Sequence, residues 1–486
     1  TLLNLNNPID YSIIIPVFNS RETLLQLYTE IIEVFTDLEK SFERIVYGLA
    51  KKFIIADWIG YFTAPVWKNS GEYNLEIRAL ALLGFSIQIY MDFSGYSDIA
   101  IGSSKLFGLT IMENFNSSND LWYQVSNVND INSPSLLVYP DRVERNILNM
   151  IGIAGGAENL RPHVKTHKMP EIIRLQMKHG IDKFKCATIS EAEMVAKCGA
   201  TDILLAIQPV GPNQQRFFQL QKEFPATKIS CIADSEDVIT QLSDMAAGMR
   251  LKAHICLDIN CGMNRTGVLP GKKASELYKL ITDSPMVKAE GLHVYDGHIH
   301  EPDFSIRPKI CNDSFTPVEH LIDELRISSA APVKIIAGGT PTFPVHALRK
   351  GVELSPGTML LWDYGYSSSF TDMEFLHAAV LLTRIISKPG KDLLCLDLGH
   401  KAVASEMPHP RIKFFELDNY TTVNHSEEHM VIKTSEADKY KIGDHLYGIP
   451  WHICPTVDRH DYVNVVYGHK VTGQWAVEGR KRKITV

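Results

Sequence analysis

The chain has 486 residues, of which 45% are hydrophobic and 22% charged, and its formal net charge is −7. This length allows two or three domains with separate cores, and the negative charge argues against a nucleic-acid partner. The eight cysteines are scattered and form no C-x-x-C pair. We therefore expect free thiols in a reducing compartment, and hence a cytoplasmic protein.

Residues 9–36 predict one strand and one helix. The apolar run Tyr11–Phe18 ends in a turn, and Leu and Ile then follow at helical spacing from Arg21 to Phe35. This segment resembles the opening of glycosyltransferases that use nucleotide sugars. The acidic D-x-D site of such enzymes does not follow, and one strand with one helix cannot bury a core. We expect a fragment without that activity.

Residues 43–116 contain two stretches, Gly48–Asp57 and Gln88–Gly102, that resemble membrane-bound O-acyltransferases of the alginate-acetylating kind. The essential histidine of that family would follow Asn116, where this chain leaves the pattern, and residues 1–121 contain no histidine. The apolar stretch Ala79–Met91 is shorter than the ~20 residues of a spanning helix. We expect no function for residues 1–121 and, at most, an association of residues 43–116 with membranes.

From Trp122 to residue 355 strand patterns alternate with helical patterns. The predicted strands are Ser135–Tyr139, Leu160–Lys165, Phe184–Thr188, Asp202–Ile207, Lys228–Ala233, Lys252–Ile259, Val287–Tyr295 and Val333–Ala337. Eight such units predict a (β/α)8 barrel over residues 122–355, with active-site residues on the loops that follow the strands. Short strands alone then predict an all-β domain over residues 356–486: Val380–Ile386, Leu393–Leu398, Lys413–Leu417, His429–Lys433, His445–Gly448 and Tyr462–Tyr467.

The octapeptide Arg161–Lys168, R-P-H-V-K-T-H-K, ends the second predicted strand. Neighbouring positive charge and desolvation lower the pKa of a lysine, and a neutral amine is needed to form a Schiff base. The octapeptide resembles the cofactor-lysine motif of the D-threonine aldolase and D-serine dehydratase family. That resemblance implies pyridoxal 5'-phosphate, an alanine-racemase-like barrel with a β-domain, and Lys165 as the Schiff-base lysine. Lys168 is the competitor, which we expect to point away from the barrel mouth.

Two further motifs resemble cofactor-binding segments of this family. Residues 337–342, A-G-G-T-P-T, follow a strand, and their glycines would let the backbone approach an anion. The resemblance assigns Gly338, Gly339 and Thr340 to the cofactor phosphate, although Gly339 replaces the usual serine. Residues 262–268, G-M-N-R-T-G-V, resemble another loop of the family. This resemblance implies that Arg265 contacts the cofactor ring or its phenolic oxygen.

Residues 291–300, G-L-H-V-Y-D-G-H-I-H, gather titratable side chains at the end of another strand. Histidine titrates near neutral pH and can act as a general base. The resemblance to aldolases places His293 and Tyr295 near the cofactor and makes His300 the base, with His298 as the alternative. Dehydratases of the family have tyrosines in place of His293 and His300, which argues against a plain D-serine dehydratase.

The segment H-I-C at residues 452–454 resembles the family's metal motif. Residues i and i+2 of an extended segment point the same way, so His452 Nε2 and Cys454 Sγ would share one divalent cation. Two protein ligands leave positions open for water and substrate, as in catalytic sites. A thiolate with an imidazole favours zinc, and some relatives use manganese.

The resemblance implies a metal-activated lyase that cleaves D-β-hydroxy-α-amino acids, such as D-threonine, to glycine and an aldehyde. Two alternatives use the same parts: a D-serine dehydratase, which gives pyruvate and ammonia, and an amino-acid racemase. A membrane-associated polysaccharide-modifying protein built on residues 1–116 is the alternative from another class. We expect a small D-amino acid as the substrate, no nucleic acid as a partner, and a homodimer.

Overall fold

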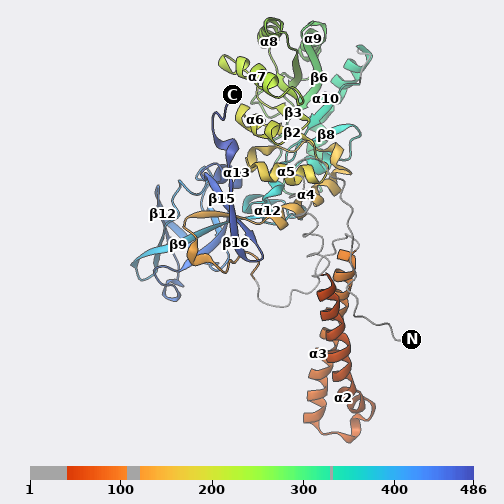
Figure 1. The fold of residues 1–486 in the computed structure, drawn as a ribbon, viewed down its shortest axis with the longest axis vertical. Helices are drawn as coiled ribbons and strands as arrows, with labels where there is room; N and C mark the ends of the chain where they lie inside the picture. The colour runs from red at the N-terminus through yellow and green to blue at the C-terminus, as the bar shows by residue number, and fades with distance from the viewer. Residues whose placement is uncertain (1–40, 107–120, 329–331) are drawn as a thin grey trace, which may run out of the picture. The chain divides into compact units, whose positions relative to one another are not determined.

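The computed structural model describes residues 41–106, 121–328 and 332–486, in two compact units, Thr1–Leu121 and Trp122–Val486 (Figure 1). The strand and helix predicted over residues 9–36 lie outside the described residues. So does the end of the acyltransferase-like stretch at Asn116.

The first unit is a helical hairpin (Figure 1). Its described elements are η1 (Ala50–Ala56), α2 (Asp57–Lys68), η2 (Ser70–Glu72) and α3 (Leu75–Leu106). Ion pairs join its two arms, for example Lys51 Nζ to Asp98 Oδ2 at 2.6 Å, whereas large apolar side chains such as Trp58 and Leu75 are exposed. None of the helices among the described residues combines the length and hydropathy that a membrane crossing needs.

The second unit contains the predicted barrel. Seven parallel strands follow one another in chain order, and the helices α5 to α11 lie between or beside them (Figure 1). The strands are β2 (Lys183–Cys186), β3 (Asp202–Leu205), β4 (Lys228–Ala233), β5 (Ala253–Ile259), β6 (Val287–Val294), β7 (Ile335–Ala337) and β8 (Val352–Leu354). The helices are α5 (Pro170–Lys178), α6 (Ile189–Lys197), α7 (Pro212–Glu223), α8 (Glu236–Met249), α9 (Lys272–Asp283), α10 (Arg307–Ser328) and α11 (Phe343–His346).

Residues 160–163 take the place of the eighth barrel strand. Leu160 pairs in parallel with Leu354 of β8, and His163 pairs in parallel with Lys185 of β2. The Lys185 N–H donates to Pro162 O at 2.9 Å. This segment is not a regular strand because Pro162 has no N–H to donate, and the 3₁₀ turn η5 (Val164–Thr166) follows at once.

One strand predicted for the barrel belongs to the other sheet. β1 (Ser135–Val138) pairs antiparallel with β9 (Ala379–Gly390) and parallel with β15 (Tyr462–Tyr467), whereas β8 completes the barrel. All four residues of β1 are buried. A fully buried strand has the same local pattern in either kind of sheet, so the prediction that β1 opens the barrel was wrong. The β-domain therefore includes residues before the barrel as well as those after it.

The β-domain is a nine-stranded mixed sheet. Besides β1, β9 and β15 it contains β10 (Leu393–Leu396), β11 (Ile412–Phe414), β12 (Thr421–His425), β13 (Met430–Lys433), β14 (His445–Pro450) and β16 (Lys470–Ala476). The remaining α-helices of this unit are α4 (Pro140–Ala154), α12 (Tyr364–Ser369) and α13 (Ile453–Val457). α13 packs against η5, so the β-domain meets the barrel beside Lys165.

Amphipathic helices and buried strands make the barrel core. α9, for example, buries Ala274, Leu277, Tyr278 and Ile281, which recur at the spacing of one helix face. A network of ion pairs lies where the strands begin: Arg161 binds Asp202 at 2.8 Å and Glu353 at 2.7 Å. The loops that follow the strands carry the site described next.

Candidate functional site

Lys165 lies in η5, directly after the segment that closes the barrel. Its backbone N–H donates to His163 Nδ1 at 3.3 Å, and its side chain lines a cavity of about 340 Å³. Arg265 and Asp258 line the same cavity. The structure thus brings together two residues that the sequence predicted, on loops that follow different strands.

Three basic side chains converge on the Tyr295 ring. The Lys165 amine lies 5.8 Å from the ring centroid, the Lys185 amine 5.3 Å, and the Arg265 guanidinium carbon 5.0 Å. Such a concentration of positive charge suits an anionic ligand. Lys185 was not predicted, because the sequence K-F-K-C of β2 shows only the alternation of an ordinary strand.

Lys168, the competitor of Lys165, has a structural role. Its amine binds Glu191 Oε1 at 2.6 Å, and the Glu191 side chain is fully buried. Its backbone adopts φ 55°, and its carbonyl accepts from Gly479 N–H at 3.0 Å. Lys168 is therefore held by other parts of the fold and does not line the cavity that contains Lys165.

The loop at residues 337–342 lies against Tyr295. The Gly339 N–H donates to Thr342 Oγ1 at 3.1 Å, and Thr340 Oγ1 accepts from the Thr358 N–H at 3.2 Å. A Cβ on Gly339 would lie 3.1 Å from Tyr295 Cε2, closer than side chains normally approach. The glycine that replaces the usual serine therefore lets the loop and Tyr295 pack closely.

His293 is buried and bound on both ring nitrogens. Its Nδ1 lies 2.7 Å from Asp258 Oδ1, and its Nε2 lies 3.3 Å from Lys185 Nζ. Burial and the charge of Lys185 lower the pKa of His293, although Asp258 acts in the opposite direction. His293 is therefore a neutral imidazole that joins Asp258 to Lys185.

The two candidate bases lie in different surroundings. His300 lines a second cavity, of about 420 Å³, together with Asp363, Tyr366 and His452. His298 instead faces Ser314, with its Nε2 3.5 Å from Ser314 Oγ. The structure thus brings His300, and not His298, to the cavity that contains the predicted metal ligand.

His452 and Cys454 form a coupled pair. Burial alone would lower the pKa of His452, but its hydrogen bond to Cys454 and the charges of Cys454 and Asp363 raise it to about 9. Burial alone would raise the pKa of the Cys454 thiol, but the hydrogen bond and charge of His452, with the charge of Lys165, lower it. Glu406 Oε1 lies 2.6 Å from His452 Nδ1, so Nε2 is the ring nitrogen left for another ligand.

The backbone around this pair differs from the prediction. His452 is extended, with φ −130° and ψ 108°, but Cys454 lies in the short helix α13 rather than in a strand. Its sulfur lies 3.2 Å from Thr166 Oγ1, next to Lys165 in the chain. The pair is therefore held at the junction of the barrel and the β-domain.

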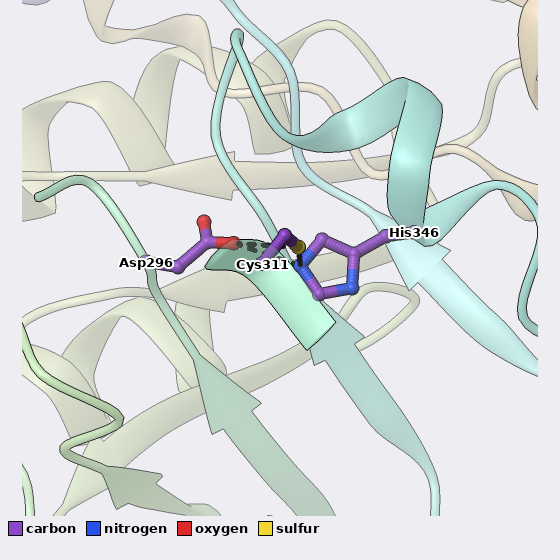
Figure 2. Close-up of side chains that lie close together, drawn as sticks. All are labelled: Asp296, Cys311 and His346. Atoms are coloured by element: carbon purple, nitrogen blue, oxygen red, sulfur yellow. Dashed lines mark hydrogen bonds and ion pairs between the residues drawn. The ribbon is translucent and has the colours of Figure 1, made fainter. Parts of the chain in front are cut away.

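A second group of side chains, of residue types that can bind metals, contacts the 337–342 loop through Thr342. Asp296, Cys311 and His346 are buried and point toward one another (Figure 2). His346 Nε2 lies 2.8 Å from Asp296 Oδ2 and 3.5 Å from Cys311 Sγ. The spacing of these atoms would permit a metal ion.

The surroundings of His346 favour a hydrogen-bonded network instead. Its Nδ1 lies 3.3 Å from Arg349 Nη1, which can only donate. The ring proton therefore sits on Nε2 and faces Asp296, whereas a metal-bound histidine donates through its other nitrogen. Asp296 also accepts from Thr342 Oγ1 at 2.7 Å. This network fixes the 337–342 loop to the end of β6.

Comparisons with known proteins agree with this arrangement. Residues 138–365 match the model of the alanine racemase N-terminal domain, and residues 378–466 match that of a putative serine dehydratase domain. A D-threonine aldolase of Arthrobacter sp. is 28% identical over 72% of this chain and 93% of its own length. A 3-hydroxy-D-aspartate aldolase of Paracoccus denitrificans is 28% identical over 72% and 92%.

More distant similarities extend this set. A D-serine dehydratase of Dictyostelium discoideum is 24% identical over 68% of this chain and 92% of its own length. The crystal structure of a D-threonine aldolase from Filomicrobium marinum superposes with a TM-score of 0.67 at 25% identity, over 72% of this chain and 96% of that one.

The first unit has relatives of another kind. A peptidoglycan O-acetyltransferase of Helicobacter pylori is 35% identical over 83 residues, and a protein of Azotobacter vinelandii named "probable alginate O-acetylase" is 40% identical over 76 residues. These matches cover only 15% and 14% of those proteins. The acyltransferase resemblance is thus real but short.

Proposed function

The chain belongs to the D-threonine aldolase and D-serine dehydratase-like family of pyridoxal-phosphate-dependent lyases, and we propose that it cleaves D-β-hydroxy-α-amino acids to glycine and an aldehyde. The observation that carries this proposal is the cavity shared by His300 and His452. It lies beside the lysine site, because Cys454 contacts Thr166, the neighbour of Lys165.

The lysine site fits pyridoxal 5'-phosphate. Lys165 would bind its carbonyl carbon, the loop with Gly338, Gly339 and Thr340 would hold its phosphate, and Arg265 would contact its ring. The Arg265 guanidinium beside Tyr295 carries the positive charge that suits this anionic cofactor. When bound, the cofactor supplies an electron-withdrawing ring that stabilises the charge left when a bond at the substrate α-carbon breaks.

His452 and Cys454 fit a divalent metal. The carboxylate of Glu406 orients His452 through Nδ1, as partners of metal-bound histidines commonly do. A lowered thiol pKa at Cys454 favours the thiolate that a metal binds. The donors favour zinc over manganese. A metal on His452 would then share the larger cavity with His300.

In this arrangement His300 would take the proton of the β-hydroxyl group. Loss of that proton allows the oxygen to form a carbonyl while the Cα–Cβ bond breaks, which releases the aldehyde. The family's dehydratases have tyrosine in place of His300.

Dehydration of D-serine is the second candidate, supported by the match of residues 378–466 to the serine dehydratase domain. We further propose a homodimer, measurable by light scattering.

The experiment compares His300→Asn with the matched control His298→Asn. Both variants are assayed with D-threonine, pyridoxal phosphate and zinc or manganese, and acetaldehyde is measured. Loss of a general base predicts a fall in kcat of about 100-fold or more for His300→Asn and a change of less than about threefold for His298→Asn. A large loss in His298→Asn alone would contradict the assignment.

A further inference from the structure

A second lysine is buried beside the site of Lys165, and the proposed cleavage gives it no step of proton transfer. Lys185 belongs to β2 and is only 2% exposed. It pairs with His163 across the barrel seam, which places it beside η5 and Lys165. Its amine and that of Lys165 both lie within 6 Å of the Tyr295 ring centroid. Two amines therefore flank one ring at the barrel mouth.

The partner of Lys185 is unusual for a buried lysine. Lys168 and Lys228 of the same barrel bind the carboxylates of Glu191 and Asp202 at 2.6 Å. Lys185 instead has His293 Nε2 as its partner, at 3.3 Å. Because Asp258 accepts from the Nδ1–H of His293, Nε2 carries the lone pair, and the Lys185 amine must donate to it. No carboxylate in the described part of the chain forms an ion pair with Lys185.

The charges around Lys185 leave its amine poised between two protonation states. Burial and the positive charge of Lys165 lower the pKa of Lys185 to about 7, with a smaller contribution from Arg265. The carboxylates of Asp258 and Asp296 act in the opposite direction. The neighbouring histidines, His163 and His293, have lowered pKa values and stay neutral, and Tyr295 is the other titratable neighbour.

An amine in that range can accept and release a proton under physiological conditions. The lysine site needs such a step because amino acids arrive as ammonium ions, which are not nucleophiles. The proton must leave before the substrate nitrogen can take the place of Lys165.

We propose that Lys185 is a second proton-transfer residue of this site, which accepts the proton that the ammonium group of an incoming amino acid must lose. An N–H bond of the substrate breaks, an N–H bond forms on Lys185 Nζ, and the electron pair stays on the substrate nitrogen. The new ammonium group donates to His293 Nε2, and the Asp258 carboxylate stabilises its charge. The inference rests on the proposed use of pyridoxal phosphate at Lys165.

The test follows the absorbance of the bound cofactor after rapid mixing of the holoenzyme with D-alanine, which has no β-hydroxyl group to cleave. The wild-type rate is expected to change little between about pH 7.5 and about pH 9. In Lys185→Met only the free amine in solution can react, so the rate falls about 100-fold at about pH 7.5. The rate of the Lys185→Met variant is also expected to rise close to tenfold per pH unit, because the fraction of D-alanine with a free amine rises by that factor.

Hydroxylamine is the matched reagent, because it is already neutral at this pH and needs no base. It is expected to react with wild type and Lys185→Met at rates within about threefold of each other. Lys185→Gln, which still donates to His293 but cannot take up a proton, is expected to behave as Lys185→Met does. It replaces Lys185→Met if that variant fails to fold.

Three outcomes would overturn the inference: an unchanged D-alanine rate in the variants, an equal slowing with both reagents, or a borohydride-reduced cofactor attached to Lys185. Absence of cofactor absorbance in the wild type would instead contradict the proposed function itself. The two failures are therefore distinguishable.

Discussion

Lys165 and Lys168 show how neighbouring residues of one kind acquire different roles. Three positions apart in the chain, one lines a cavity among other cations, and the other forms an ion pair with the fully buried Glu191. The difference comes from the backbone. η5 turns the chain after His163, and Lys168 then adopts a left-handed conformation that directs it to α6.

Substitution of these two lysines should separate cofactor binding from stability. Lys165→Ala is expected to lose the absorbance of covalently bound cofactor while its urea-unfolding free energy changes by less than about 1 kcal/mol. Lys168→Met leaves a buried carboxylate unpaired, so it should lose about 3 kcal/mol of stability and keep the absorbance. The reverse pattern would show that Lys168 carries the cofactor.

The coupled state of His452 and Cys454 predicts a pH dependence of metal binding. A raised pKa of about 9 keeps His452 protonated at neutral pH, and a metal must displace that proton. The affinity for zinc or manganese should therefore rise about tenfold per pH unit between about pH 7 and pH 8.5. Titration calorimetry on the metal-free protein at several pH values measures this affinity. An affinity that does not change with pH would exclude this pair as the ligands.

At the residue scale, local motifs predicted Lys165 as the proposed cofactor lysine and His452 with Cys454 as the proposed metal pair, whereas Lys185 was not predicted. Arg161–Lys168 and His452–Cys454 are short segments that carry their own signal. The burial of Lys185 depends on the pairing of β2 with His163 and on the position of His293 in β6, which lie far apart in sequence. A lysine in a four-residue strand gives no sign of such long-range partners.

Among the secondary-structure elements, the barrel seam and its ion pairs hold the site in place. Pro162 of the closing segment has no N–H to donate, and the Arg161 side chain adds ion pairs with Asp202 of β3 and Glu353 of β8. Because the guanidinium is almost completely buried, its charge needs an ionised carboxylate beside it. The seam that positions Lys165 therefore depends on charge.

This dependence predicts a loss of stability in acid. Burial alone would raise the pKa of Asp202, but Arg161 and Lys228 lower it to about 2. Because the pKa of Asp202 is lower in the folded state, its ionised carboxylate stabilises the folded protein at pH values above the unfolded-state pKa. This stabilisation is lost as the pH falls toward 2. Asp202→Asn should lower the free energy of unfolding by about 2 kcal/mol at neutral pH. The difference in unfolding free energy between the variant and the wild type should become smaller below about pH 4. Urea unfolding across this range provides the measurement, and a gap independent of pH would refute the mechanism.

The elements themselves were predicted unevenly. Most barrel strands and their helices followed from alternating patterns, but β8 (Val352–Leu354) was not predicted, and β1 was assigned to the wrong sheet. Local sequence does not specify the direction of the partner strand. In the β-domain, β12 and β16 were missed, because their largely exposed residues lack an apolar face.

The whole molecule consists of two units of unequal importance for the proposed chemistry. Both cavities and every residue assigned to the cofactor, the metal and proton transfer lie within Trp122–Val486. A protein of residues 122–486 is therefore expected to match the full chain in cofactor absorbance and in kcat within about twofold. Spectra and initial rates of the two purified proteins test this. A loss of cofactor binding on removal of residues 1–121 would give the first unit a role.

The most direct test of the proposed lyase supplies D-threonine and D-serine separately to the purified chain with pyridoxal phosphate and zinc or manganese, and identifies the products. Glycine with acetaldehyde from D-threonine is the predicted result, and it would support His300 as the base beside the metal. Pyruvate with ammonia from D-serine, without cleavage of D-threonine, would contradict the account and assign the site to dehydration.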